Sequence, residues 1–252
     1  MKKVSQCLIL AAGNGTRIRR VSAGLPKPLV HFRGQPMLEH IILRAHEAGI
    51  DNFVIVVGYR ADLIRDAFNN RLAGKVSVTW VENPDYHKSN GISALAAKDE
   101  IKTNFLLLMA DHLFEAETAK ALIRQRLGPG EVILAVDAQI DRVFDLDDAT
   151  KVRRDGEHIV DIGKEIPSYD ALDTGMFLCS PALFDKLESA TTNGNCSLSE
   201  GMRLLARNRK LRAFEINSDW QDVDTPEALA HAESVFECGL HSEPSTERLT
   251  SV

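Results

Sequence analysis

The feature that most constrains the fold of this chain is a regular alternation of apolar, strand-like runs with helix-like segments through its first half. The apolar runs are short, and the segments between them repeat their apolar residues at helical spacing. Strands that alternate with helices through short connections indicate βαβ units, which form a parallel sheet covered on both faces. The pattern predicts strands over 4–12, 51–59, 75–83 and 104–112, and helices over 36–49, 61–72, 90–101 and 116–127.

The second half of the chain keeps strands and helices but loses this regular order. Residues 151–163 are typical of a hairpin that turns at Asp155-Gly156. No linker rich in Pro, Gly or Ser is present, so we predict one domain over residues 1–237 and a polar, disordered tail over 238–252. The expected fold is a Rossmann-like, three-layer α/β/α fold with a mostly parallel central sheet. Further strands are expected over 131–138, 171–180 and 210–218, and further helices over 181–188, 197–208 and 225–236.

Composition and charge limit what the chain can bind. Its 252 residues carry a net charge of -6, which argues against a general nucleic-acid surface but leaves room for a local basic pocket. No apolar run is long enough to span a bilayer, and the short apolar segment near the N-terminus is interpreted as a strand rather than a signal peptide. We therefore expect a cytoplasmic protein without membrane insertion. The four cysteines are scattered, lack metal-ligand spacing and are expected to be reduced: Cys7, Cys179, Cys196 and Cys238.

The first predicted strand ends in a glycine-rich loop, AAGNGTR, and the element PKPLV follows it. Ligands of open parallel sheets bind at the carboxyl ends of strands. Gly13 and Gly15 let the backbone approach a ligand closely, and consecutive N–H groups can hold an anion. Arg17 and Lys27 can balance several negative charges, so the composition indicates a triphosphate site. The loop lacks the Gly-Lys of a Walker A motif, and Ile18 replaces the third glycine of the dinucleotide fingerprint. A glycine-rich turn with solvated cations is the structural alternative.

Loop and PKP element together resemble the signature of nucleotidyltransferases that make NDP-sugars and related activated alcohols. The resemblance implies a nucleotidyltransferase fold in which the loop wraps the nucleotide while an arginine and a lysine hold its phosphates. The segments MADH, DATKV, DIGKE, LDTG and WQDVDTPE are more specific and resemble CTP:inositol-1-phosphate cytidylyltransferases, over nearly the whole chain to about Glu237. The matching loop positions are Gly13, Gly15, Thr16, Arg17 and Lys27, with the backbone of Ala11 and Ala12 beside them.

Two aspartates at the ends of predicted elements indicate a metal site. Asp111 ends an apolar strand and Asp224 precedes a helix. Two carboxylates from separate strand ends can hold Mg²⁺, and the resemblance places the metal ligands of the family at these positions. Asp222 is a second candidate. Asp111 could instead be a turn residue and Asp224 a helix cap, although Thr225 can supply that cap.

The remaining segments imply an acceptor site and a base pocket. By resemblance, Lys164 binds the phosphate of the acceptor, and Asp173, Thr174 and Gly175 bind its hydroxyls, as a carboxylate can. Lys151 could also reach a phosphate, or it could be an ordinary surface lysine. The base would lie near the segment ENPDYHKSNGIS, although the asparagine and serine there could equally be helix caps. The candidates for the base pocket are Asn83, Asn90, Gly91 and Ser93.

The chemistry implied is transfer of CMP from CTP to a phosphorylated polyol such as inositol 1-phosphate, giving CDP-inositol and pyrophosphate. A phosphate that is already dianionic needs no general base, so His112 is interpreted as a packing or hydrogen-bonding residue. The expected partners are CTP, the acceptor, Mg²⁺ and a separate membrane CDP-alcohol phosphotransferase. The sequence does not indicate whether the protein is a monomer or an oligomer. Phosphocholine, another phospho-alcohol or a sugar 1-phosphate are alternative acceptors. A nucleotide-sensing subunit without catalysis and a purely structural α/β protein are alternatives of other classes.

Overall fold

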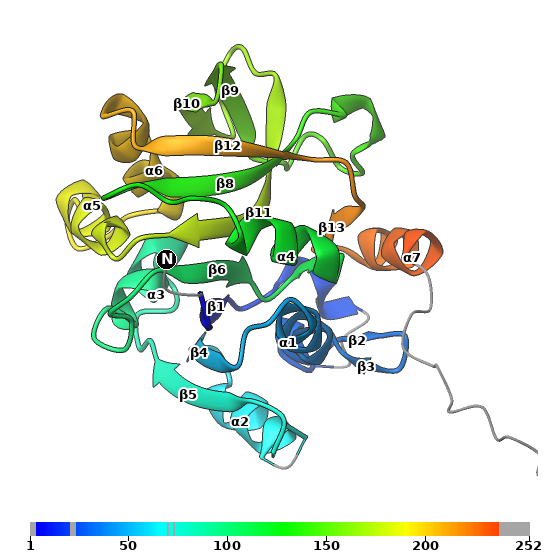
Figure 1. Ribbon diagram of the computed structural model, residues 1–252. Helices are drawn as coiled ribbons and strands as arrows, with labels where there is room; N and C mark the ends of the chain where they lie inside the picture. The colour runs from blue at the N-terminus through cyan, green and yellow to red at the C-terminus, as the bar shows by residue number, and fades with distance from the viewer. Residues whose placement is uncertain (1–3, 21–23, 70, 73, 237–252) are drawn as a thin grey trace, which may run out of the picture.

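The computed structural model describes residues 4–20, 24–69, 71–72 and 74–236. Its centre is a sheet of nine strands in the order β5-β4-β1-β6-β11-β8-β12-β10-β9, with helices on both faces (Figure 1). The strands are β1 (Gln6–Ala11), β4 (Asn52–Val57), β5 (Ser77–Glu82), β6 (Phe105–Met109), β8 (Val132–Asp137), β9 (Lys151–Asp155), β10 (His158–Gly163), β11 (Ala171–Cys179) and β12 (Leu211–Ile216). The helices are α1 (Met37–Glu47), α2 (Ala61–Phe68), α3 (Asn90–Ala96), α4 (Ala116–Ile123), α5 (Ala182–Ala190), α6 (Leu198–Arg207) and α7 (Pro226–Val235).

Side chains of the central strands point alternately into two apolar layers, one on each face of the sheet, which explains the three-layer architecture. On β1, Cys7 and Ile9 pack in the layer that contains α1, α2 and α4. Leu8 and Leu10 point to the opposite layer, with α3, α5 and α6. Both faces of the strand are therefore buried, as the continuous apolar run in its sequence predicted. Burial also raises the pKa of the Cys7 thiol and keeps it protonated.

The sheet is parallel where the sequence alternates regularly and mixed beyond it. β5, β4, β1 and β6 are parallel to one another, and so are β8 and β12. β11 runs antiparallel to both β6 and β8, and it joins the two parallel groups. β9 and β10 form the predicted hairpin, and β9 also pairs with the start of β11, so this end of the sheet curls. The Rossmann-like α/β fold is thus confirmed, with one antiparallel strand at its centre.

Short elements that the sequence pattern did not predict complete the fold. The strands β7 (His112–Phe114) and β13 (Trp220–Asp222) pair as a small antiparallel ribbon, and β2 (His31–Phe32) pairs with β3 (Gln35–Pro36). Three 3₁₀ turns are η1 (Arg17–Arg20), η2 (Lys27–Leu29) and η3 (Ile140–Arg142). The predicted tail over 238–252 lies outside the described residues. Of the helices in the described part, none combines the length and the hydropathy that crossing a membrane requires.

A third, small apolar cluster supports the loop and the ribbon together. Ile18 is fully buried there, with Leu113 of β7, Val223 after β13 and Ala232 of α7. Ile18 is the residue that departs from the dinucleotide fingerprint, and its burial explains the departure. Its side chain anchors the end of the glycine-rich loop to the elements that carry the acidic residues.

Candidate functional site

Two hollows adjoin each other at the carboxyl ends of β1 and β6. The first is lined by the glycine-rich loop, Lys27 and Pro28. The second lies under the segment that connects β8 with β9 and reaches Lys164 and Asp173. Arg17, Asp111 and Asp224 line both hollows, so the two spaces meet at these three residues.

The glycine-rich loop needs its second glycine for the lysine that lies beneath it. Gly15 has a φ of +53°, and a Cβ placed there would lie 2.6 Å from the Cβ of Lys27. A Cβ on Gly13 would meet nothing within 4 Å, so that position faces the open first hollow. The two glycines therefore have different roles: Gly15 makes room for Lys27, and Gly13 leaves the backbone accessible to a ligand.

Lys27 is the buried cation of the site, with 7% of its side chain exposed. Its Nζ donates to Asp111 Oδ2 at 2.7 Å and to Asp224 Oδ1, and it lies 3.8 Å from Asp222 Oδ1. Burial alone would lower the pKa of Lys27, but the three carboxylates outweigh it and raise that pKa. Burial alone would likewise raise the pKa of Asp111, but Lys27 and His112 hold it well below its usual value. The site thus contains a fixed ammonium group among charged carboxylates.

The ribbon of β7 and β13 brings the acidic residues together from distant parts of the chain. Asp222 pairs with His112 in its register, and the backbone N–H of Val223 donates to the carbonyl of Asp111 at 2.9 Å. The Oγ1 of Thr225 accepts from Ala228 N–H and caps α7, as predicted, so the Asp224 carboxylate can face Lys27 and Arg17.

His112 is held rigidly beside these carboxylates. Its Nδ1 lies 2.9 Å from Asp111 Oδ1, and its ring stacks on Trp220 with 6.1 Å between ring centroids. Trp220 in turn donates from Nε1 to the buried Asp137 at 2.9 Å. Burial alone would lower the pKa of His112, but Asp222 and Asp111 outweigh it and raise the pKa to about 9. The interpretation of His112 as a hydrogen-bonding residue agrees with this geometry.

The donor set fits a hard divalent cation. One buried oxygen of Asp222 accepts no hydrogen bond from the described residues, and burial together with Asp111 raises the pKa of that carboxyl to about 6. Oxygens of Asp148, Asp222 and Asp224 all lie within 4.8 Å of one another. Mg²⁺ is bound in proteins by such carboxylate oxygens and water. Asp222 is therefore as much a part of the acidic cluster as Asp111 and Asp224, the two metal ligands that the sequence favoured.

The second hollow contains Lys164 and one more acid, the partly buried Asp173. Asp173 lines it, its Oδ1 accepts from Gly175 N–H at 2.7 Å, and burial raises its pKa to about 6. Asp148 bridges Arg17 and Lys164, with its Oδ2 2.6 Å from Arg17 and its Oδ1 2.5 Å from Lys164. Asp148 was not a sequence candidate, because it is one of several acids in an irregular polar segment.

Several predicted binding residues have their polar groups engaged within the fold. Asn83 donates to Ser93 Oγ at 3.0 Å, and both are buried. Thr174 donates to the carbonyl of Ala135 at 2.8 Å and does not line the second hollow. Lys151 donates to the carbonyl of Asp147 at 3.1 Å, also outside that hollow. Their roles in binding remain predictions.

Three further predicted residues, Asn90, Gly91 and Gly175, make close contacts within the fold near the second hollow. Asn90 lines the hollow, and its Oδ1 accepts from Leu198 N–H at 2.8 Å. A Cβ on Gly91 would lie 2.6 Å from the carbonyl oxygen of Cys196. A Cβ on Gly175 would lie 2.5 Å from the His112 ring, so this glycine makes room for the histidine.

The fold and the site together define the class of protein. A glycine-rich loop after a parallel strand, a buried lysine among carboxylates and an adjoining second hollow are features of a nucleotidyltransferase. The chain belongs to the family of MobA-like NTP transferase domains, whose model matches residues 7–211.

Relatives agree with this assignment. A bifunctional IPC transferase and DIPP synthase of Rubrobacter xylanophilus is 35% identical over 231 residues, which cover 90% of this chain and 51% of the relative. The chain spans about half the length of the first curated relatives that it matches. The UTP–glucose-1-phosphate uridylyltransferase AglF of Haloferax volcanii is 28% identical, and the match covers 90% of this chain and 95% of AglF. The solved structure of the inositol-1-phosphate CTP transferase from T. maritima superposes with a TM-score of 0.82 at 26% identity, over 93% of this chain and 95% of that one.

Proposed function

We propose that this chain transfers CMP from CTP to inositol 1-phosphate, forming CDP-inositol and releasing pyrophosphate. The observation that carries the proposal is the meeting of the two hollows at Arg17, Asp111 and Asp224, beside the buried Lys27. A reaction between two phosphorylated molecules needs two adjacent binding spaces and cations where they meet. Relatives named for IPC transfer and for inositol-1-phosphate CTP transfer support the choice of substrates.

The first hollow would hold the nucleotide. The backbone of the glycine-rich loop approaches the phosphates at Gly13, while Lys27 and Arg17 balance their charge. Lys27 is well suited to this role because it is already desolvated and held by three carboxylates, so little reorganisation accompanies the reaction.

The second hollow would hold the acceptor. Lys164 would bind the phosphate and Asp173 the ring hydroxyls, since a carboxylate can accept from two neighbouring hydroxyls. At pH 7 the phosphate is largely dianionic, because its second pKa is about 6, and no protein base has to deprotonate it. One of its oxygens attacks the α-phosphorus in line, a new P–O bond forms, and the bond to the β-phosphate breaks as pyrophosphate leaves.

Asp111 and Asp224 would hold Mg²⁺, with Asp222 as a third carboxylate beside them. When bound, the ion supplies neutralisation of negative charge on the phosphate oxygens. Lys27 would stay close to it and share that charge, while His112 keeps Asp111 in place through its 2.9 Å contact.

A second candidate is uridylyl transfer to glucose 1-phosphate. The observation that favours this candidate is the similarity to AglF, because the match extends over 95% of the length of AglF. Phosphocholine is a weaker candidate, because a quaternary ammonium group calls for an aromatic cage and only 6% of the residues are aromatic.

The test is pyrophosphate release with Mg²⁺ over a grid of CTP, UTP, ATP, GTP and dTTP against inositol 1-phosphate, glucose 1-phosphate and phosphocholine. We expect release with CTP and inositol 1-phosphate well above every other pair. Preference for UTP with glucose 1-phosphate would replace the proposal with the second candidate. Absence of release with every pair, from folded protein that binds nucleotide, would favour a non-catalytic nucleotide sensor.

A further inference from the structure

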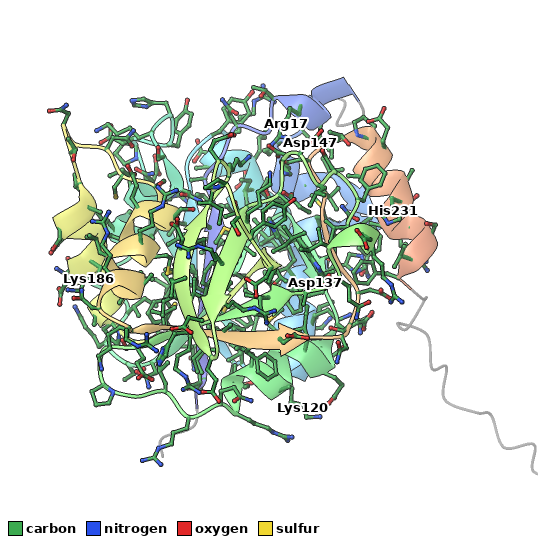
Figure 2. All side chains as sticks on the ribbon, turned by 90° about the horizontal axis from the view of Figure 1, so that it is seen from above. Arg17, Lys120, Asp137, Asp147, Lys186 and His231 are labelled. Carbon is green, nitrogen blue, oxygen red and sulfur yellow. The ribbon has the colours of Figure 1, made fainter. Side chains whose placement is uncertain are left out.

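Asp148 lies beside Asp222 and Asp224, but its contacts with two cations have no role in the proposed reaction. It belongs to the segment over residues 138–150 that connects β8 with β9 and covers the second hollow. Each of its carboxylate oxygens contacts a different cation: Oδ2 lies 2.6 Å from Arg17, and Oδ1 lies 2.5 Å from Lys164. These are the cations that the proposed function assigns to phosphate groups. Figure 2 shows Arg17 and Asp147, the neighbour of Asp148, at the same end of the molecule.

A carboxylate in this position resembles part of a phosphate group. Guanidinium and ammonium groups bind carboxylate and phosphate oxygens through the same charge-assisted hydrogen bonds. Burial alone would raise the pKa of Asp148, but Lys164 and Arg17 outweigh it and lower that pKa to about 2. Asp148 is therefore ionised at every pH at which the enzyme would work, and its charge always opposes an incoming anion.

The contacts of Asp148 can be exchanged without unfolding the site. The exposed fractions of the side chains are 29% for Asp148, 49% for Arg17 and 51% for Lys164, so water reaches all three. The segment is attached elsewhere, because the ring of Phe144 stacks on His231 of α7 with 4.8 Å between centroids. Rotation of the Asp148 side chain would leave that attachment and the sheet intact.

We propose that Asp148 is an internal competitor for the phosphate of the acceptor: it binds Arg17 and Lys164 in the free enzyme, and a phosphate dianion displaces it. The inference rests on the proposed function, because that function assigns Lys164 to the phosphate of the acceptor, and Arg17, which lines both hollows, faces that phosphate as well as the nucleotide. Asp148 thereby selects for acceptors that carry a full phosphomonoester dianion. An anion with less charge gains too little from the two cations to replace the carboxylate.

The direct probe is inorganic phosphate, titrated calorimetrically into the full chain without nucleotide. Asp148→Asn removes the competing charge and keeps the shape of the side chain. Two exposed ion pairs no longer have to be broken, so the Kd for phosphate should fall roughly three- to tenfold. Asp147→Asn makes the same charge change one residue away, on an exposed side chain outside the hollow, and should leave that Kd unchanged.

Lys164→Ala locates the effect. If Asp148 acts through Lys164, adding Asp148→Asn to Lys164→Ala should give a clearly smaller gain in phosphate affinity than Asp148→Asn gives alone. Unfolding temperatures of all variants establish that each is folded, and Asp148→Ser serves as a second removal of the charge.

Kinetics separate competition from positioning. With saturating CTP, whose phosphates share Arg17, Asp148→Asn should still lower the KM for inositol 1-phosphate through Lys164. The change should be roughly two- to fivefold, the size expected for one exposed ion pair, and so no larger than the change in the phosphate Kd. An unchanged or weaker affinity for phosphate in Asp148→Asn would overturn the proposal and make Asp148 a residue that positions the two cations. If the wild type has no activity with this substrate pair but Asp148→Asn still binds phosphate more tightly, the proposed function fails while the role of Asp148 stands.

Discussion

Among the single residues, Lys27 is the group on which the site depends most. Its ammonium group separates Asp111, Asp222 and Asp224, which would otherwise repel one another in a partly buried space. Lys27→Met should reduce kcat about 10²- to 10³-fold, because a preorganised charge is lost from the transition state. Pyrophosphate release measures this, with Lys186→Met on α5 as the control, since Lys186 lies well away from Arg17 (Figure 2). A nearly normal rate for Lys27→Met would remove the lysine from the mechanism.

Asp173 should make the stability of the protein depend on pH. Burial raises its pKa from 3.8 to about 6, so between these values the folded state keeps a proton that the unfolded state has released. The stability that this retained proton contributes is fully present below the pKa of Asp173 in the unfolded chain. It is lost as the pH rises through about 6, the pKa of Asp173 in the folded protein. Asp173→Asn removes the titrating group, so the unfolding free energy of the variant should depend less on pH. Between a pH of about 4 and a pH of about 7.5, the variant should lose about 1–3 kcal/mol less unfolding free energy than the wild type, at roughly 1.36 kcal/mol per pKa unit. Denaturant unfolding at several pH values checks this, and parallel profiles for the two proteins would contradict it.

Gly175 offers a matched comparison with another glycine. Gly175 has a φ of +75° and contacts the His112 ring, whereas Gly156, at the hairpin turn, has a φ of +59° and open space where a Cβ would lie. Gly156→Ala should cost about 1 kcal/mol of backbone strain and leave turnover unchanged. Gly175→Ala carries the same strain and in addition displaces His112, so it should be less stable and should also lose activity. Equal effects of the two substitutions on turnover would show that the contact with His112 is unimportant.

Among the elements, the ribbon of β7 and β13 determines where the acidic residues lie. Trp220→Phe keeps a ring against His112 but removes the hydrogen bond from Nε1 to Asp137, leaving a buried carboxylate without that donor. The variant should lose about 1–3 kcal/mol of unfolding free energy. It should also bind Mg²⁺ more weakly in the absence of substrate, because Asp222 is in the same strand. Calorimetry measures that binding, and Trp80→Phe is the control, since β5 is an edge strand of the main sheet and does not belong to the ribbon. Equal Mg²⁺ affinities of the two variants would contradict the role of the ribbon.

The long elements could be predicted from the sequence, and the ribbon could not. Each strand and helix of the two apolar layers carries its own periodicity, so β1 or α6 can be recognised without reference to the rest of the chain. β7 and β13 have three residues each and are strands only because they pair across more than 100 positions. For that reason the sequence indicates Asp222 only as a second candidate for the metal site. The bridge from Asp148 to Arg17 and Lys164 was missed for a related reason, because an irregular polar segment shows no pattern that indicates its partners.

For the protein as one unit, the mixed sheet explains why the site has two halves. The parallel strands β1 and β6 bring the glycine-rich loop and Asp111 to one edge, and the antiparallel β11 carries Asp173 and Gly175 towards the same place. A wholly parallel sheet would end all its strands in one row of loops. The antiparallel strand instead contributes side chains from its own length, and these line the hollow assigned to the acceptor.

The two hollows, in our proposal, serve one reaction. Phosphorus NMR of wild-type protein with CTP, inositol 1-phosphate and Mg²⁺ is the sharpest test, because it follows both substrates and both products in one sample. We predict that CTP and the phosphomonoester disappear in equal amounts, while pyrophosphate and a pyrophosphate diester appear in the same amounts. Loss of CTP without matching loss of inositol 1-phosphate, or no change in either signal, would contradict the proposal.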